Sequence, residues 1–149
     1  MAEGKIMDVE QKEPSKAIAD IVRDAFASKY GNELEEIEQA EGFDIEDFLN
    51  RAKIKGINVI VSFQSIIFGE SYADGSQQIQ EETYNIYIKR AQGEVRSLVK
   101  EFRQEFDKSE NQSFTAIDGQ TYSITFTTGD VQMIDKKSVF MIPVIVKFD

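Results

Sequence analysis

The stretch 83-TYNIYIKRAQGEVRSLVKEFRQEF-106 decides the fold, because its apolar residues change period within this one segment. Over Thr83–Lys89 they alternate, which is the period-two pattern of a half-buried strand. From Gly93 to Phe106 they recur every three or four positions, which lines one side of a helix. The link Arg90–Gly93 is short, so we expect the helix to fold back over the apolar face of the strand. The residues predicted to meet there are Tyr84, Ile86, Ile88, Val95, Leu98, Val99, Phe102 and Phe106.

The length of the chain indicates one domain. Its 149 residues are enough to bury about two thirds of the unfolded surface around a single core. We predict a single domain over residues 14–149, preceded by a flexible N-terminal arm, residues 1–13, whose mixed charges show no periodicity. No apolar run of about 18 residues exists, and the N-terminus lacks a basic region followed by a hydrophobic one. We therefore expect a soluble protein that stays in the cytoplasm where it is made.

Two helices are predicted ahead of this stretch. The first begins after Pro14 and is stopped by Gly31. Its apolar residues recur at helical spacing and are Ile18, Ile21, Val22, Ala25 and Phe26. The acidic segment Glu33–Glu41 fits a short edge strand or a frayed helix. Asp44 can cap a second, short helix, which we expect to end near Lys53.

The remaining periodic segments predict strands. Ile57–Phe63 is β-branched and alternating, and Ile60 indicates partial cover on its second face. Asp118-Gly119 between two alternating runs predicts a hairpin. Val139–Phe148 is the closing strand, in which Pro143 lacks an amide donor and indicates an edge, a bulge or an unpaired position. The fold class that follows is α+β, a mainly antiparallel sheet of four to five strands covered by two main helices plus one short helix.

The connection Gln64–Glu82 is long for a small domain, and such connections are usually functional or mobile. The strand before it already fills its inward positions with Val59, Val61 and Phe63, so at least one apolar residue that follows lacks a burial site within the chain. Exposed apolar residues in a row mark interfaces. We predict a contact arm whose interface residues are Ile66, Ile67, Phe68 and Tyr72. The alternative is that the strand simply continues into a long hairpin with the Thr83 strand.

The residue types that catalysis most often uses are absent. The chain has no Cys and no His, which removes disulfides, thiolate zinc sites, a Cys nucleophile and the commonest general base. Asp44, Glu46 and Asp47 could bind a hard cation, but their position at a helix start favours capping. Asp130 and Asp135 flank a turn, where loop solubility is the usual explanation. We expect no enzymatic activity, no metal and no cofactor.

The chain is strongly acidic, with a formal net charge of −10. This charge opposes close approach to a phosphate backbone, so we expect no specific nucleic-acid binding. Part of it lies in the segment Glu33–Glu41, where Glu35, Glu36 and Glu38 line a lumen or a subunit boundary under one hypothesis. Under the other they are simply a solvated face.

A pattern of elements over residues 15–149 carries a resemblance to a known family. Its parts are the helix Ile18–Tyr30, the turn Gly31-Asn32-Glu33-Leu34, the strands Ile57–Phe63 and Tyr84–Arg90, the helix Gly93–Phe106, the turn Asp118-Gly119 and the strand Val139–Phe148. Taken together, they resemble the tail-terminator or tail-completion proteins of long-tailed phages, in particular the small tail proteins of Mu-like phages.

The resemblance implies a structural virion or prophage protein that forms a ring, commonly sixfold, at the head-proximal end of the tail tube. Such a ring ends tube growth and joins the tail to the head. The implied partners are further copies of itself, the tail-tube protein and the head–tail connector protein, with no membrane. The implied location is the cytoplasm of the bacterial host and then the virion tail, and an acidic lumen would keep DNA from adhering. The alternative is a small α+β domain that binds a ligand or peptide along an exposed sheet edge next to Pro143.

Overall fold

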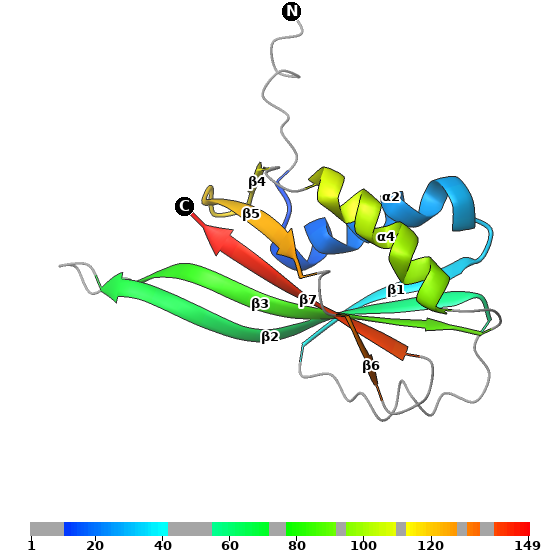
Figure 1. Ribbon diagram of the computed structural model, residues 1–149. Coiled ribbons are helices and arrows are strands. Elements are labelled where there is room, and N and C mark those ends of the chain that lie inside the picture. Colours follow the sequence, from blue (N-terminus) through cyan, green and yellow to red (C-terminus); the bar gives the residue numbers. More distant parts are fainter. Residues whose placement is uncertain are drawn as a thin grey trace, which may run out of the picture.

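The computed structural model describes residues 11–41, 55–71, 77–91, 95–109, 113–127, 131–134 and 139–149. Figure 1 shows the elements that these ranges contain. In chain order they are α2 (Pro14–Tyr30), β1 (Leu34–Glu41), β2 (Ile57–Ser71), β3 (Gln77–Arg90), α4 (Val95–Ser109), β4 (Ser113–Thr115), β5 (Thr121–Phe126), β6 (Gln132–Ile134) and β7 (Val139–Phe148). Both long helices and the hairpin β4–β5 lie where the sequence predicted them.

The strands form one mixed sheet in the order β1-β2-β3-β7-β5-β4, and β6 pairs with the part of β7 that β5 does not reach. The sheet curls strongly into a half-barrel, and both helices lie over the same face (Figure 1). The predicted fold class is therefore wrong. The described sheet has seven strands instead of four to five, and β1 runs parallel to β2 instead of antiparallel.

Two features of the chain explain this difference. Residues 42–56 separate β1 from β2, and a parallel pair needs a connection of about a dozen residues or more, which this link provides. The strand β6 has three residues, which is too short to display a period-two pattern, and the sequence did not predict it. Acidic β1 does take the edge of the sheet, as one of the two interpretations of Glu33–Glu41 predicted.

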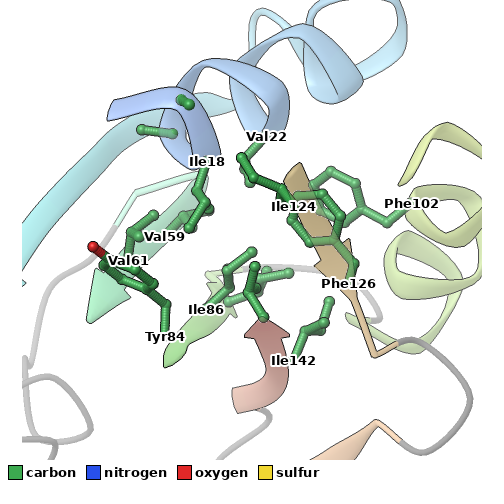
Figure 2. Packing of buried hydrophobic residues seen from close by; sticks show 14 of the residues in the cluster. Ile18, Val22, Val59, Val61, Tyr84, Ile86, Phe102, Ile124, Phe126 and Ile142 are labelled. Atoms are coloured by element: carbon green, nitrogen blue, oxygen red, sulfur yellow. The ribbon is translucent and has the colours of Figure 1, made fainter. Parts of the chain in front are cut away.

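The core lies between the helices and the sheet. Leu98 and Phe102 of α4 are buried in the same cluster as Ile86 and Ile88 of β3, which confirms the packing predicted from the change of period. The ring of Phe102 also meets the ring of Phe26 on α2 edge to face. Figure 2 shows side chains from both helices and several strands converging there, among them Ile18, Val22, Val59, Ile86, Phe102 and Ile124.

The opposite face of the sheet holds a second, smaller apolar cluster. Ile60, Tyr87 and Val139 are buried there, and Ala40 and Met141 pack against them. The cover predicted at Ile60 is therefore confirmed, and the central strands are buried on both faces.

Gly56 makes a corner at the start of β2 that only glycine fits. Its φ is +58°, and a Cβ at this position would lie 1.9 Å from the carbonyl oxygen of Glu33. That oxygen accepts a 2.8 Å hydrogen bond from the amide of Ile57, and the Gly56 carbonyl accepts one of the same length from the amide of Ala91. The corner therefore ties together the starts of β1 and β2 and the end of β3.

Pro143 lies inside the sheet and not at an edge, because β7 has β3 on one side and β5 and β6 on the other. β5 pairs with β7 only from Val144 onward and β6 only as far as Met141, so Pro143 falls between them. Its carbonyl accepts a 2.8 Å hydrogen bond from the amide of Thr127. The nitrogen and oxygen of one strand residue face the same side, so the missing N–H faces this gap. Of the three predicted possibilities, the structure shows an unpaired position on this side of β7, while Pro143 pairs with Asn85 of β3 on the other side.

The entry of the chain into α2 is attached to the β4–β5 hairpin. The amide of Lys12 donates to the Thr115 carbonyl at 2.9 Å, and the hydroxyl of Tyr122 donates to the Lys12 carbonyl. The Ile117 amide donates to a carboxylate oxygen of Glu13 at 3.2 Å. These bonds position the last residues of the predicted N-terminal arm, of which residues 1–10 lie outside the described ranges.

Several further predictions fall on residues outside the described ranges. They concern the short helix from Asp44 to Lys53 with its acidic first turn, and the turn flanked by Asp130 and Asp135. The structure therefore leaves these predictions untested.

Candidate functional site

β2 and β3 continue past the rest of the sheet as a two-stranded arm, defined here as residues 64–71 of β2 and 77–80 of β3. β1 pairs with β2 only as far as Phe63, and β7 pairs with β3 only from Glu81 onward. Within the described ranges, the strands of the arm pair only with each other. Figure 1 shows the arm reaching away from the body on the side opposite α4.

The arm carries three exposed apolar side chains in a row. Ile66 is 37%, Ile67 48% and Phe68 53% exposed. Ile66 pairs with Glu82, which shares the helix-side face of β3 with Tyr84, and Ile67 pairs with Glu81, so alternation places Ile66 on that face and Ile67 on the other. The arm therefore offers apolar surface on both of its faces, which a free protein in water does not need.

The register of β2 against β3 shifts three times along the arm, between Phe63 and Ser65, between Ile67 and Phe68, and between Phe68 and Ser71. Bulges of this kind bend a ribbon and increase its twist. Most of the connection Gln64–Glu82 is thus strand, as the hairpin alternative expected, while its apolar residues stay exposed. Tyr72, the fourth predicted interface residue, lies outside the described ranges.

A buried carboxylate lies at the root of the arm, and one side-chain hydrogen bond ties the arm to the β4–β5 hairpin. Glu82 is only 8% exposed, and its carboxylate accepts a 2.8 Å hydrogen bond from the hydroxyl of Tyr84. Burial, followed by this hydrogen bond, raises the pKa of the Tyr84 phenol, which stays protonated as a donor. The side chain of Gln120 on the hairpin donates to the Ile79 carbonyl at 3.2 Å. Sequence reasoning missed the burial of Glu82, because this residue lies in a polar stretch that resembles a loop.

The predicted acidic residues lie on the edge strand β1 but do not share one face. Ile37 packs into the main core and Ala40 into the second cluster, so alternation places Glu36 and Glu38 on the face away from the helices. A register shift between Leu34 and Glu36 sets Glu35 apart. Glu35 and Glu36 are exposed and Glu38 is half-buried, so this strand presents acidic groups at one end of the sheet.

A groove of about 240 Å³ runs between α2 and α4. Its lining combines apolar Ala25, Phe26, Leu98 and Phe102 with polar Lys29, Tyr30, Glu101 and Gln104. Its volume is below the roughly 300–1,000 Å³ of ordinary small-molecule pockets. Phe26, Leu98 and Phe102 are at most 2% exposed, so the groove is a small depression that exposes mainly the polar side chains of its lining.

Charged groups fix one wall of this groove. Glu101 accepts hydrogen bonds from the ammonium of Lys29 and, at 2.6 Å, from the hydroxyl of Tyr30. These two bonds, that from Lys29 first, lower the pKa of the Glu101 carboxyl, and the same contact raises the pKa of Lys29. The bonds hold α2 and α4 together at the end of α2.

An arginine fork continues this network at the Gly56 corner. Arg90 donates to both carboxylate oxygens of Glu33, from Nε at 2.6 Å and from a terminal nitrogen at 2.9 Å. Its guanidinium also lies over the Tyr30 ring, 5.4 Å from the centroid. The arrangement is a structural clamp between β1, β3 and α2. No sequence signal could have found it, because its members are far apart in the chain.

Neither a cluster of metal-ligating side chains nor a membrane-spanning helix is found among the described residues. They contain no group of three or more metal-ligating side chains, and none of their helices is long and apolar enough to cross a bilayer. No protein-family model and no curated protein matches the chain. The exposed arm is thus the feature of the described surface that points most directly to an interaction.

Proposed function

We propose that this chain is a structural subunit of a phage or prophage tail that assembles with copies of itself into a ring at the head-proximal end of the tail tube. In this role it ends tube growth and joins the tail to the head, and it catalyses no reaction. Its partners are the tail-tube protein and the head–tail connector protein. It acts in the host cytoplasm during assembly and then remains in the virion tail.

The observation that supports the proposal is the apolar arm on a firmly built body. A hydrogen bond from the Gln120 side chain ties the arm to the β4–β5 hairpin at Ile79, while Ile66, Ile67 and Phe68 remain exposed. A rigid projection of this kind suits a contact between one subunit and the next, because little ordering is needed when the contact forms. The net charge of −10 suits a channel through which DNA passes without adhering.

The proposal is tested by measuring the mass of the purified chain, alone and mixed with a tail-tube protein, and by imaging the product. We expect ring particles, formed either spontaneously or on the tube end, and tubes of limited length in the mixture. A chain that stays monomeric at high concentration and leaves tube growth unchanged would contradict the proposal.

The acidic strand provides a second test. Reversing Glu35, Glu36 and Glu38 to Lys should leave the monomer folded, because all three lie on an edge strand and none is fully buried. If β1 lines the lumen or a subunit boundary, the triple variant should lose assembly or DNA passage. Tails of normal length with full infectivity would show that these residues are only a solvated face.

A second candidate function is a small domain that binds a ligand or an extended peptide along a sheet edge. The observation in its favour is that β2 has no strand partner on its outer edge beyond Phe63 within the described ranges. An open edge accepts a peptide strand through main-chain hydrogen bonds. The edge is not the one next to Pro143, which lies inside the sheet. This function predicts a protein that remains small under every condition of the mass measurement.

A further inference from the structure

The outer edge of β2 changes its surroundings at Phe63. As far as that residue β1 pairs with it, and beyond that residue no strand does within the described ranges. An edge of this kind presents a row of unpaired main-chain N–H and C=O groups, which is a template for one more strand. The chemistry of the edge therefore specifies its partner as an extended segment of polypeptide.

This open edge is regular over four residues, Ser65–Phe68. The register with β3 places one extra residue of β2 at Gln64 and another at positions 69–70, while the remaining extra residue, Gln80, belongs to β3. β2 itself therefore runs without a bulged residue from Ser65 to Phe68. All four residues are exposed and none is charged. The segment thus lacks both the charges and the bulges that keep an edge strand from pairing.

The other edges that the described sheet presents are protected. β1 has four Glu residues among its eight, and charged side chains on an edge keep other strands away. β4 and β6 have three residues each, and so short a strand is a poor template. On the β3 side of the arm, the Ile79 carbonyl accepts a 3.2 Å hydrogen bond from the Gln120 side chain. Among these edges, Ser65–Phe68 is the one without such protection.

We infer that two copies of this chain pair through this edge, with Ser65–Phe68 of one copy antiparallel to the same segment of the other. An identical partner fits because the segment is uncharged, so no like charges face each other across the pair. Centred on Ile67, the pair sets Ile67 against its own counterpart and Ile66 against Phe68 of the other copy. The arm projects from the body, so a second arm can lie beside it (Figure 1).

The pairing removes the surface that the arm leaves exposed. Ile66, Ile67 and Phe68 are 37%, 48% and 53% exposed in the single chain, and each gains an apolar neighbour in the pair. Burial of apolar surface stabilises the contact in addition to the new main-chain hydrogen bonds. An antiparallel contact between identical strands is two-fold, so it closes on two copies and leaves no open patch for a third.

The pairing itself goes beyond the proposed function and does not depend on it. One consequence does rest on that function: the pair occupies the residues that the proposed ring contact needs. Free copies would then be held as pairs, and they would separate when they meet the end of a tail tube. Pairing of this kind would keep rings from forming before a tube exists.

The absence of Cys allows a direct test by disulfide formation. In the inferred pair the two Ile67 Cα atoms lie about 4.5–5.5 Å apart, which is within the range of a disulfide. We expect Ile67→Cys to give a covalent dimer on mild oxidation. Met133→Cys is the matched control, because Met133 is also about half exposed and lies on the short strand β6, and it should give none. Oxidation of Ile67→Cys that is no faster than that of the control would overturn the inference.

A charge at the same position tests the pairing without a covalent bond. Ile67→Lys sets two lysines opposite each other, so the dissociation constant of the pair should rise roughly tenfold or more. Met133→Lys adds the same charge at the control position and should leave the constant unchanged. Analytical ultracentrifugation measures both. Association that Ile67→Lys leaves unchanged would place the contact elsewhere and overturn the inference.

The outcomes separate the pairing from the proposed function. Pairs that Ile67→Lys dissociates, in a chain that forms no rings and does not limit tube growth, would support the pairing and contradict the function. Rings formed by a chain that gives no disulfide at Ile67→Cys would contradict the pairing and leave the function standing. A chain that stays monomeric at high concentration but binds an extended apolar peptide would overturn the pairing and support the second candidate function.

Discussion

The two halves of β2 have the same kinds of residue and opposite environments. In Ile57–Phe63, Val61 is fully buried and Ile60 is 1% exposed, whereas Ile67 and Phe68 in the second half are about half exposed. The difference lies in the neighbours, because β1 stops pairing at Phe63 and the helices cover only the first half. A β-branched apolar run therefore predicts a strand, while burial depends on what the rest of the fold brings to it.

The largest predicted difference in unfolding free energy is between two phenylalanine-to-alanine substitutions, one in the core and one on the arm. Phe102→Ala should lower the free energy of unfolding by roughly 3–5 kcal/mol, because its side chain is only 2% exposed and fills the main core. Phe68→Ala is the matched control on the arm, where the side chain is 53% exposed, and should cost less than about 1 kcal/mol. Denaturant unfolding measures both. Equal costs would mean that the arm belongs to the folding core.

An isoleucine pair sharpens the comparison within one strand. Ile60→Ala should cost roughly 2–5 kcal/mol, because Ile60 is buried in the second cluster with Tyr87 and Val139. Ile67→Ala should cost less than about 1 kcal/mol, since Ile67 is 48% exposed. Denaturant unfolding of the monomeric variants measures both costs. A cost for Ile67→Ala that approaches the cost for Ile60→Ala would show that the buried part of β2 does not end at Phe63.

The smallest expected effect concerns the clamp that holds the body together at the Gly56 corner. The hydrogen bond from Arg90 lowers the pKa of Glu33 below its ordinary value of 4.5. When a carboxyl has a lower pKa in the folded protein than in the unfolded chain, it stabilises the folded protein at pH values above the unfolded-chain pKa. This stabilisation is lost as the pH falls through the pKa of the folded protein. Melting temperatures measured from pH 7 downward should therefore fall in acid, and Arg90→Met should remove part of that fall.

Arg90→Met should leave the arm unaffected, because Arg90 pairs with Ile57 at the end of β2–β3 that is opposite the arm. If Arg90→Met leaves the dependence of the melting temperature on pH unchanged, the ion pair between Arg90 and Glu33 does not contribute to the loss of stability in acid. Arg96→Met on the exposed side of α4 is a matched control, because it removes a charge that forms no ion pair with the residues the structure describes.

Local patterns were sufficient to predict both helices, the hairpin and the packing of α4 on β3. The change of period between Thr83 and Phe106 is a property of neighbouring residues, and so is the positive φ of +90° that Gly119 provides at the β4–β5 turn. Leu98 and Phe102 are buried as their spacing predicted. Such features do not depend on distant parts of the chain.

The direction of β1, the short strands and the polar clamps depend on contacts between distant segments. Nothing in the acidic run Leu34–Glu41 shows whether it will pair parallel or antiparallel with β2. Arg90 and Glu33 are 57 positions apart, and Tyr30 and Glu101 are 71 apart. For the candidate site, sequence reasoning found the exposed residues Ile66, Ile67 and Phe68 but left open whether their segment was a contact arm or the continuation of a hairpin, and the structure shows paired strands.

The most direct test of the account is the double variant Ile67→Asp and Phe68→Ser, assayed both for melting temperature and for assembled mass. If the arm is a contact between copies, the monomer should melt within about 2 °C of the unaltered protein, because exposed positions contribute little to folding. Assembly into rings or onto the tail tube should be lost at the same time. A variant that unfolds, or one that assembles normally, would contradict the assignment of the arm as the contact between subunits.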